Sequence, residues 1–492
     1  MDIGAFLVKL LQGGAGNLAA YLAAHVLLCL LPAFFIAGGM SALIPKESVT
    51  RFLGRNAPKF ISYPAAALAG SVLAVCSCTI VPLFAGIYKK GAGLGPAITF
   101  LFFAPAGNIL ALAYTGVAIG PDLAFARLFL SLTFGVGIGL IMALIFSRED
   151  AAHEKAEDAA FSAAGSMRPA RTIFLLLIVA LLLSGTLQLD FLTGSYGQIT
   201  LPIGGLDRLE DALFALVPYD ASRGEEGVTA QGLILIGLLG LIALTAWKGF
   251  EKIFDGFTGW TWTVLGLAGF TLLVAAVRMT PQANGLLIDF RGKMFAVLII
   301  LGALVYMMRS QLSGDELRDW IWESWRFVKQ IFPLLIVGVF TVGVLRQLIQ
   351  PEWIKAVAGS NTLLGNLAGV AFGVFMYFPT LVEVPIANMF LSLGMHRGPL
   401  LAYLMADPEL SLQSILIVST IIGKLKSWTY VGWVALFSTL AGLIYGAWID
   451  GMSLWLLVAI VTGALALLGA ALWQMDARNH RRDMEAAAVN EE

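Results

Sequence analysis

Long apolar stretches, separated by short polar segments, run through the whole chain. Thirteen of them approach or exceed the length of helix, about 20 residues, that crosses the hydrocarbon core of a bilayer. They lie at about 18–43, 62–88, 93–119, 122–147, 172–189, 230–247, 258–277, 293–308, 328–349, 363–392, 398–423, 427–448 and 453–473. This pattern predicts an all-α, polytopic integral membrane protein.

Polar segments divide the chain into parts. Residues 148–171 are charged and rich in Ala, Ser and Gly, and residues 190–229 form the longest non-apolar loop. The expected organisation is a first repeat (1–147), a cytoplasmic linker (148–171), inserted transmembrane spans (172–310), a second repeat (311–449), and a final span with a charged tail (450–492).

An internal repeat is the main organisational signal. Adding 303 to the numbering aligns residues 70–142 with 373–445 without a gap and gives 14 identities, eight of them Gly or Pro. Chance matches would fall more often on Leu and Ala, so we interpret the chain as a duplication. The matched glycines are Gly70 and Gly373, Gly91 and Gly394, Gly95 and Gly398, Gly120 and Gly423, and Gly139 and Gly442.

Basic residues give the expected orientation. They cluster at 46–59, 148–171, 248–252, 309–329 and 478–482, and the positive-inside rule assigns these clusters to the cytoplasm. The first repeat then enters its basic loop from outside, whereas the second enters its polar loop near Pro351 from inside. The two repeats are therefore expected to have inverted topology. This requires one interrupted run in each repeat to be re-entrant, and the side of Lys89 and Lys90 depends on which run it is.

Prolines interrupt the apolar runs at matched positions. They are Pro82, Pro96 and Pro105 in the first repeat, and Pro385, Pro399 and Pro408 in the second. Because proline lacks an N–H and clashes with the carbonyl four residues back, we expect the helix to break between residues 76 and 82. In lipid such a break survives only where protein or a water-filled cavity covers it. Half-helix ends at such breaks supply partial charges that coordinate a substrate or ion, although most membrane prolines only kink packing helices.

Cys76 and Cys78 lie at the first of these breaks. In a continuous helix their side chains point roughly 200° apart, but in an unwound segment both can face one side. Thiolates prefer soft acceptors such as Cu(I), Zn²⁺ or a trivalent metalloid. The alternative is that both are small buried hydrophobes. Cys29 lies one turn after His25, and we interpret that pair as packing.

Glu383 marks the corresponding break of the second repeat, where it takes the position of Ile80. A carboxylate in apolar surroundings marks an ion or proton path by default, so we expect Glu383 to carry protons. The alternative is a structural carboxylate paired with Lys424 or Lys426.

The candidate site has two parts. The expected substrate-binding residues are Cys76, Cys78, Thr79, Pro82, Asn108, Pro385 and Asn388. The expected proton-coupling residues are Glu383, Asp407 and Lys424.

Composition narrows the class of protein. The chain is 59% hydrophobic and 13% charged, whereas soluble domains have about 25% charged residues. A net charge of −1 gives no reason to expect nucleic acid, so the expected partners are the bilayer and a small-molecule or metalloid solute, with homo-oligomerisation left open. The sequence lacks HExxH, GxSxG and GxxxxGK[ST] motifs, and we expect no enzyme activity, cofactor or resident metal.

Several motifs resemble the bacterial predicted permease family that includes the trivalent organoarsenical efflux permeases. They are Cys76–Phe84, Gly91–Ala97 and Pro105–Asn108 in the first repeat, and Val382–Pro385, Gly394, Gly398–Pro399 and Gly423–Lys424 in the second. The resemblance covers roughly 18–147 and 320–448, and the spans at 172–308 make this chain longer than compact members. It implies export of trivalent organoarsenicals, which bond to paired thiols. It also implies that the motif residues of the family correspond in this chain to Cys76, Cys78, Pro82, Glu383 and Pro385.

The expected function is therefore secondary-active transport in the bacterial inner membrane. A multi-pass permease would export a small soft or thiol-reactive solute, of the trivalent (organo)arsenical type, in exchange for protons. One alternative is a sulfur-compound or anion permease or channel, in which hydroxyls and backbone dipoles bind the solute. Another is a membrane thiol redox enzyme in which Cys76 and Cys78 form a disulfide, although the chain offers neither bis-His spans nor CxxC. A scaffold or sensor would not need unwound backbone at membrane depth.

Overall fold

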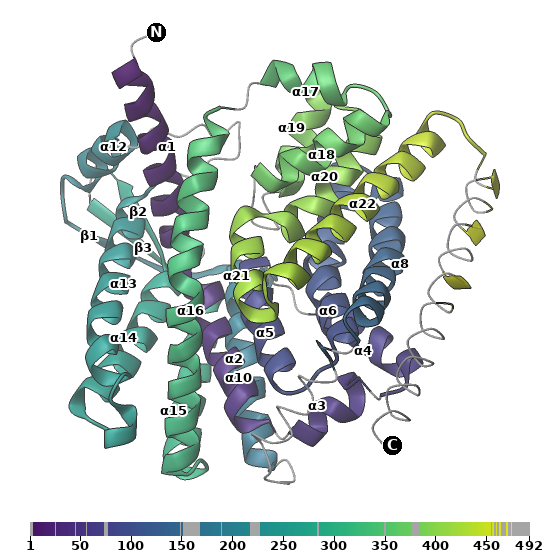
Figure 1. Ribbon diagram of the computed structural model, residues 1–492. Helices are drawn as coiled ribbons and strands as arrows, with labels where there is room; N and C mark the ends of the chain where they lie inside the picture. Colours follow the sequence, from purple (N-terminus) through teal and green to yellow (C-terminus); the bar gives the residue numbers. More distant parts are fainter. Residues whose placement is uncertain are drawn as a thin grey trace, which may run out of the picture.

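The protein is a bundle of helices with a small three-stranded sheet near one end (Figure 1). The computed structural model describes residues 3–24, 26–44, 46–55, 57–72, 77–147, 149–150, 168–187, 189–216, 227–282, 285–348, 351–375 and 383–453, with scattered positions from 455 to 474. The predicted final span at 453–473 lies mostly outside the described residues.

Membrane-spanning helices dominate the described residues. Eight of the described helices are long and apolar enough to cross a membrane, or nine if one bent pair counts as a single span. This confirms the predicted polytopic helical fold. The inserted spans correspond to α10 (Pro169–Thr186), α13 (Ala230–Gly249), α14 (Gly259–Ala276) and α15 (Gly292–Ser310).

The sheet lies in the loops of the insert, where the apolar pattern gave no sign of it. β1 (Ser195–Leu201) pairs antiparallel with β3 (Gly285–Arg291), which pairs antiparallel with β2 (Arg278–Gln282). Two short helices flank β1, α11 (Asp190–Thr193) and α12 (Leu206–Leu216). A 3₁₀ turn (Ile253–Asp255) joins α13 to α14 at the other end of the insert.

The two halves contain corresponding helices. The first has α1 (Ile3–Ala24), a π-helical turn (Val26–Leu30), α2 (Leu31–Leu43), α3 (Lys46–Leu53), α4 (Lys59–Val72), α5 (Ser77–Lys89), α6 (Leu94–Ala106), α7 (Ile109–Ala118) and α8 (Pro121–Ile145). The second has α16 (Gly314–Arg346), α17 (Pro351–Ala358), α18 (Leu363–Phe375), α19 (Glu383–Ser392), α20 (Arg397–Leu410), α21 (Leu412–Ile422) and α22 (Lys424–Ile449). After adding 303, the bounds of α4, α6, α7 and α8 fall within one residue of those of α18, α20, α21 and α22. The duplication itself stays a prediction from the sequence.

We interpret the two helices on either side of each interruption as a re-entrant hairpin. α4 has 14 residues and α5 has 13. At 1.5 Å per residue each is about 20 Å long, too short for a hydrocarbon core of about 30 Å. The Gly93 N–H after α5 donates to the Leu53 carbonyl before α4 over 2.7 Å, so the hairpin leaves the bundle where it entered. His396 N–H and the Ala358 carbonyl make the corresponding bond around α18–α19 over 2.9 Å.

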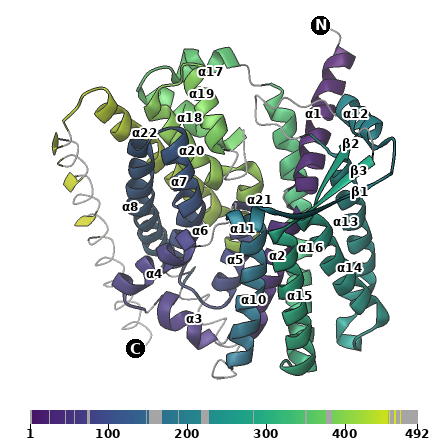
Figure 2. The ribbon, with the colours of Figure 1, turned by 180° about the vertical axis from the view of Figure 1, so that it is seen from behind.

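The two hairpins enter from opposite ends of the bundle. Figure 1 places α3 at the lower end and α17 at the upper end, and Figure 2 shows the same from behind. Lys89, at the end of α5, lies 3.9 Å from Glu323, which also pairs with Arg326 of the basic cluster at 309–329. Lys89 therefore belongs to the end that the charge pattern assigns to the cytoplasm. Inverted topology itself stays a prediction from the sequence.

Pro82 does not break its helix, which corrects the expectation drawn from the sequence. α5 runs from Ser77 through Pro82 to Lys89. Near the start of a helix a proline removes one hydrogen bond, to the carbonyl of residue 78, without ending the helix. The separation between α4 and α5 falls at residues 73–76, which lie outside the described residues.

Glycine pairs matched by the repeat lie at matched helix crossings. A Cβ at Gly139 would lie 2.6 Å from the Gly95 carbonyl oxygen, and a Cβ at Gly442 would lie 2.6 Å from the Gly398 carbonyl oxygen. α8 therefore crosses α6, and α22 crosses α20, at a backbone distance that any side chain would prevent. Two of the Gly matches between the two halves, four glycines in all, thus have one physical cause.

Candidate functional site

The two halves meet through their broken segments. α5 packs against α21, and α19 packs against α7, so each re-entrant hairpin contacts the second limb of the other half's interrupted span. α6 also packs against α20, and α8 against α22. α20 and α21 meet at a 47° bend around Ser411, the counterpart of the Gly107–Asn108 interruption between α6 and α7. The breaks therefore gather at the interface between the halves.

A buried ion pair crosses this interface. Nη2 of Arg127, on α8, lies 2.5 Å from Oε1 of Glu383, the first residue of α19. Both side chains are 0% exposed, and 256 residues separate them in the chain. Removing one partner of a buried ion pair leaves the other charge uncompensated, so this contact ties the two halves together.

Helix ends favour both charges of the pair. Arg127 Nε donates to the carbonyl of Ala106 over 3.0 Å, and Nη1 donates to the hydroxyl of Thr115 over 3.3 Å. Ala106 is the last residue of α6, and the C-terminal end of a helix carries partial negative charge. Glu383 occupies the opposite kind of end, the N-terminus of α19, where a carboxylate is stabilised.

Two further carboxyl groups are buried in the last turn of α20. Asp407 is 0% exposed and Glu409 is 4% exposed. The Tyr430 hydroxyl donates to Glu409 Oε2 over 2.7 Å. In the repeat numbering Tyr430 corresponds to Arg127 and Glu409 to Ala106, so the same two positions are hydrogen-bonded in both halves.

The structure describes part of the predicted thiol site. Thr79 is fully buried near the start of α5, and Pro82 is buried one turn later. Asn108 is 2% exposed at the interruption between α6 and α7. Cys76 lies outside the described residues, and of Cys78 the structure describes only the backbone, which belongs to α5.

The predicted residues of the second repeat divide into buried and exposed ones. Glu383 and Asp407 are buried at the interface. Asn388 is exposed on α19, and the side chain of Pro385 lies outside the described residues. Lys424 is exposed at the first position of α22, whereas Glu383 is buried. The position of Lys424 therefore does not support its predicted role in proton coupling.

The partner of Glu383 was not identified from the sequence. The two alternatives considered, Lys424 and Lys426, are both excluded as its partner, since Glu383 pairs with Arg127 and Lys426 pairs with Glu149 at 3.1 Å. One signal was available, because Arg127 is a charged residue inside the apolar run at 122–147, and such residues are rarely without function.

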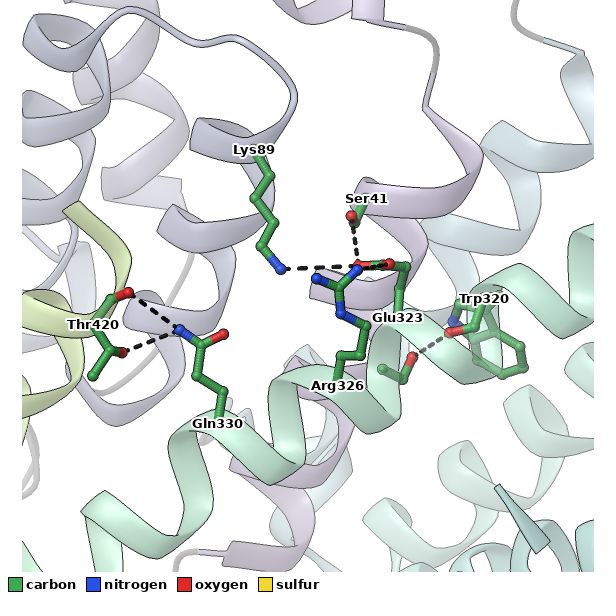
Figure 3. A network of polar contacts seen from close by, with 8 residues as sticks. Ser41, Lys89, Trp320, Glu323, Arg326, Gln330 and Thr420 are labelled. Carbon is green, nitrogen blue, oxygen red and sulfur yellow. Dashed lines mark hydrogen bonds and ion pairs between the residues drawn. The ribbon is translucent and has the colours of Figure 1, made fainter. Parts of the chain in front are cut away.

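A polar network holds the cytoplasmic end of α5. Figure 3 shows Lys89, Ser41 and Arg326 converging on the carboxylate of Glu323. Lys89 Nζ also lies 4.0 Å from the centre of the Phe327 ring. This network ties α5 to α2 and α16. At the left of the same view, a hydrogen bond from the Gln330 amide to the Thr420 hydroxyl links α16 to α21.

A cavity of about 450 Å³ lies elsewhere, between the insert, α2 of the first half and α16 of the second half. Its lining is almost entirely apolar and comes from α2, α13, α14 and α16, with Phe34, Trp247 and Phe332 among its residues. None of the predicted site residues lines it. The cavity is therefore separate from the buried charges.

Comparison with known proteins places these features in a family. A family model named ArsP_1 and described as "Predicted permease" matches residues 12–447. The chain belongs to this predicted permease family. The match runs through both halves and the insert between them, and it makes the chain a membrane permease.

Relatives of the permease occur in archaea and bacteria. The UPF0718 protein MJ0584 of Methanocaldococcus jannaschii is 32% identical over 448 residues, covering 91% of this chain and 98% of that protein. The UPF0718 protein YraQ of Escherichia coli is 26% identical over 215 residues, 41% of this chain and 56% of that protein. No solved structure matches the chain. The alignment with the archaeal relative therefore covers nearly all of both proteins.

Proposed function

We propose that this permease is a secondary-active exporter of a small soft or thiol-reactive solute, of the trivalent (organo)arsenical type, in exchange for protons. We place it in the bacterial inner membrane. The buried Arg127–Glu383 pair supports this proposal most directly, because it joins the two halves at the site where their broken segments meet. A titratable carboxylate in that position can couple a proton to movement of one half against the other.

Paired thiols supply the proposed solute chemistry. The backbone of Cys78 belongs to the first turn of α5, and Cys76 comes two residues earlier in the chain. Two thiols this close in sequence suit a soft, thiol-reactive centre.

Transport assays with cysteine variants test the thiol part. Cys76→Ser/Cys78→Ser is expected to abolish arsenical efflux from proteoliposomes, whereas Cys29→Ser, in the π-helical turn, should transport as the unaltered protein does. Sensitivity of a deletion strain to arsenicals, antimonials, thiols and oxyanions selects the solute beforehand. Undiminished efflux by the double variant, at equal expression, rules out thiol binding.

Replacement of Glu383 tests the proton part. Glu383→Gln should retain solute binding while efflux no longer follows an imposed proton gradient. Since the substitution also leaves Arg127 without its counter-ion, binding has to be measured on the same preparation. An E383Q variant whose efflux still responds fully to the gradient removes Glu383 from the coupling mechanism.

Arg127 favours a second candidate function, transport of an anion or sulfur oxyanion. Its guanidinium is fully buried and donates through all three nitrogens, and an anionic solute can take the place of Glu383 when that carboxyl is protonated. Under this function the double cysteine variant keeps its flux. Arg127→Lys loses it, because an ammonium cannot reproduce the planar, forked donor geometry.

A further inference from the structure

The interface between the halves buries more acidic than basic groups. Asp407 and Glu409 on α20, and Glu383 on α19, are each at most 4% exposed. Arg127 is the guanidinium buried with them, and it is bound to Glu383. If Glu383 and Glu409 were both ionised beside this one guanidinium, they would leave a net charge of −1 inside the membrane, which is strongly disfavoured.

No other cation on the neighbouring helices compensates this excess within the described residues. The helices that pack against α20 are α6, α8, α18, α19, α21 and α22. Apart from Glu383 and Arg127, their charged side chains are Asp122, Lys424 and Lys426. Lys426 pairs with Glu149, Lys424 is exposed, and Asp122 pairs with Arg397, on the first turn of α20, at 2.8 Å.

Position along the helices distinguishes the carboxyl groups. Glu383 starts α19, where the helix end is positive, and also contacts Arg127. Glu409 lies in the last turn of α20, next to the final residue Leu410, where the helix end is negative and repels a carboxylate. Helix position therefore favours an ionised Glu383 and a neutral Glu409.

The local hydrogen bonding of Glu409 suits a neutral carboxyl group. Tyr430, the titratable side chain that contacts it from α22, donates its hydroxyl to Oε2 over 2.7 Å. Oε1 is buried and has no hydrogen-bond partner among the described residues. An ionised carboxylate needs several donors when it leaves water, whereas a protonated one can be held by a single donor.

We infer that Glu409 is a proton-binding site of the permease, protonated while Glu383 is ionised and held by the hydroxyl of Tyr430. Glu409 stands at the bend between α20 and α21, so a change of the bend alters the surroundings of its carboxyl group. Its participation in transport rests on the proposed function, whereas its protonation in the purified protein does not.

Infrared spectroscopy tests the inference on the full-length protein in lipid nanodiscs at neutral pH. The C=O stretching band of protonated carboxyl groups should lose the share of one group in Glu409→Gln, which keeps the acceptor for Tyr430. Asp122→Asn is the matched control, because Asp122 is ionised and paired with Arg397, and it should leave the band unchanged. An undiminished band in a folded E409Q variant overturns the inference.

Tyr430→Phe provides a second measurement that keeps Glu409 in place. Loss of the hydroxyl donor should move the carboxyl band to higher frequency, and a band that does not move overturns the assignment to Glu409. Because neither spectrum depends on a solute, a protein that fails to export arsenicals can still show both changes. Failure of the proposed function and failure of this inference are thereby separated.

Discussion

Removing one side of the Arg127–Glu383 pair should destabilise the protein more than any change at an exposed ion pair. Both charges are fully buried, so each needs the other to offset the loss of water. Breaking such a pair costs about 3–5 kcal/mol. With each 1.4 kcal/mol worth about a factor of ten, the folded-to-unfolded ratio should fall by roughly two to three and a half powers of ten.

The two single variants should differ in severity. Arg127→Met leaves Glu383, which can take up a proton and become neutral. Glu383→Gln leaves a guanidinium that stays charged in proteins, so it should be the more damaging change. The double variant Arg127→Met/Glu383→Gln should recover part of the loss, because no unpaired charge remains.

Denaturant titration of the purified protein in mixed micelles measures these differences as a double-mutant cycle. Asp122→Asn is the control, because the Asp122–Arg397 pair also joins α8 to α20 but its side chains are 27% and 30% exposed. Its loss should cost less than about 1 kcal/mol. Equal stability of Glu383→Gln and Asp122→Asn, or fully additive losses in the double variant, would refute the reasoning.

Other regions give three further predictions. Gly442→Ala should cost about 1–3 kcal/mol by overpacking, since its Cβ would meet the Gly398 carbonyl, whereas Gly432→Ala on the same helix meets nothing within 4 Å and should be neutral or stabilising in the same titration. In the three-stranded sheet the Ser195 hydroxyl donates to Asp289 and holds the pKa of that carboxyl below its usual range. The resulting stabilisation is present above the unfolded pKa of about 3.9 and is lost as pH falls through the lower folded pKa. Asp289→Asn should remove the acid-induced rise in β1 hydrogen exchange, and an unchanged rise contradicts this. Single cysteines at Thr50 in α3 and Lys355 in α17 should react with impermeant reagents from opposite sides of the membrane, and labelling from one side would exclude inverted topology.

Much of the helical framework was predictable because the bilayer limits the choices. A chain in lipid must satisfy its backbone groups within helices, so apolar length alone located the inserted spans to within a few residues. The spacing of Gly95, Gly139 and their mates was informative for a similar local reason, since a close helix crossing admits only glycine. Pro82 was misleading, because its effect depends on how far it lies from the helix start.

The sequence by itself determined the class of fold, the number of inserted spans and the interruption near Asn108. Each of these depends on neighbouring residues and on the bilayer. Only the tertiary structure decided that Arg127 is the partner of Glu383 and that Glu409 meets Tyr430 at the α20–α21 bend. From the sequence, several basic residues were equally plausible partners for Glu383. Which one pairs with it depends on how two distant half-helices pack, and no local pattern encodes that packing.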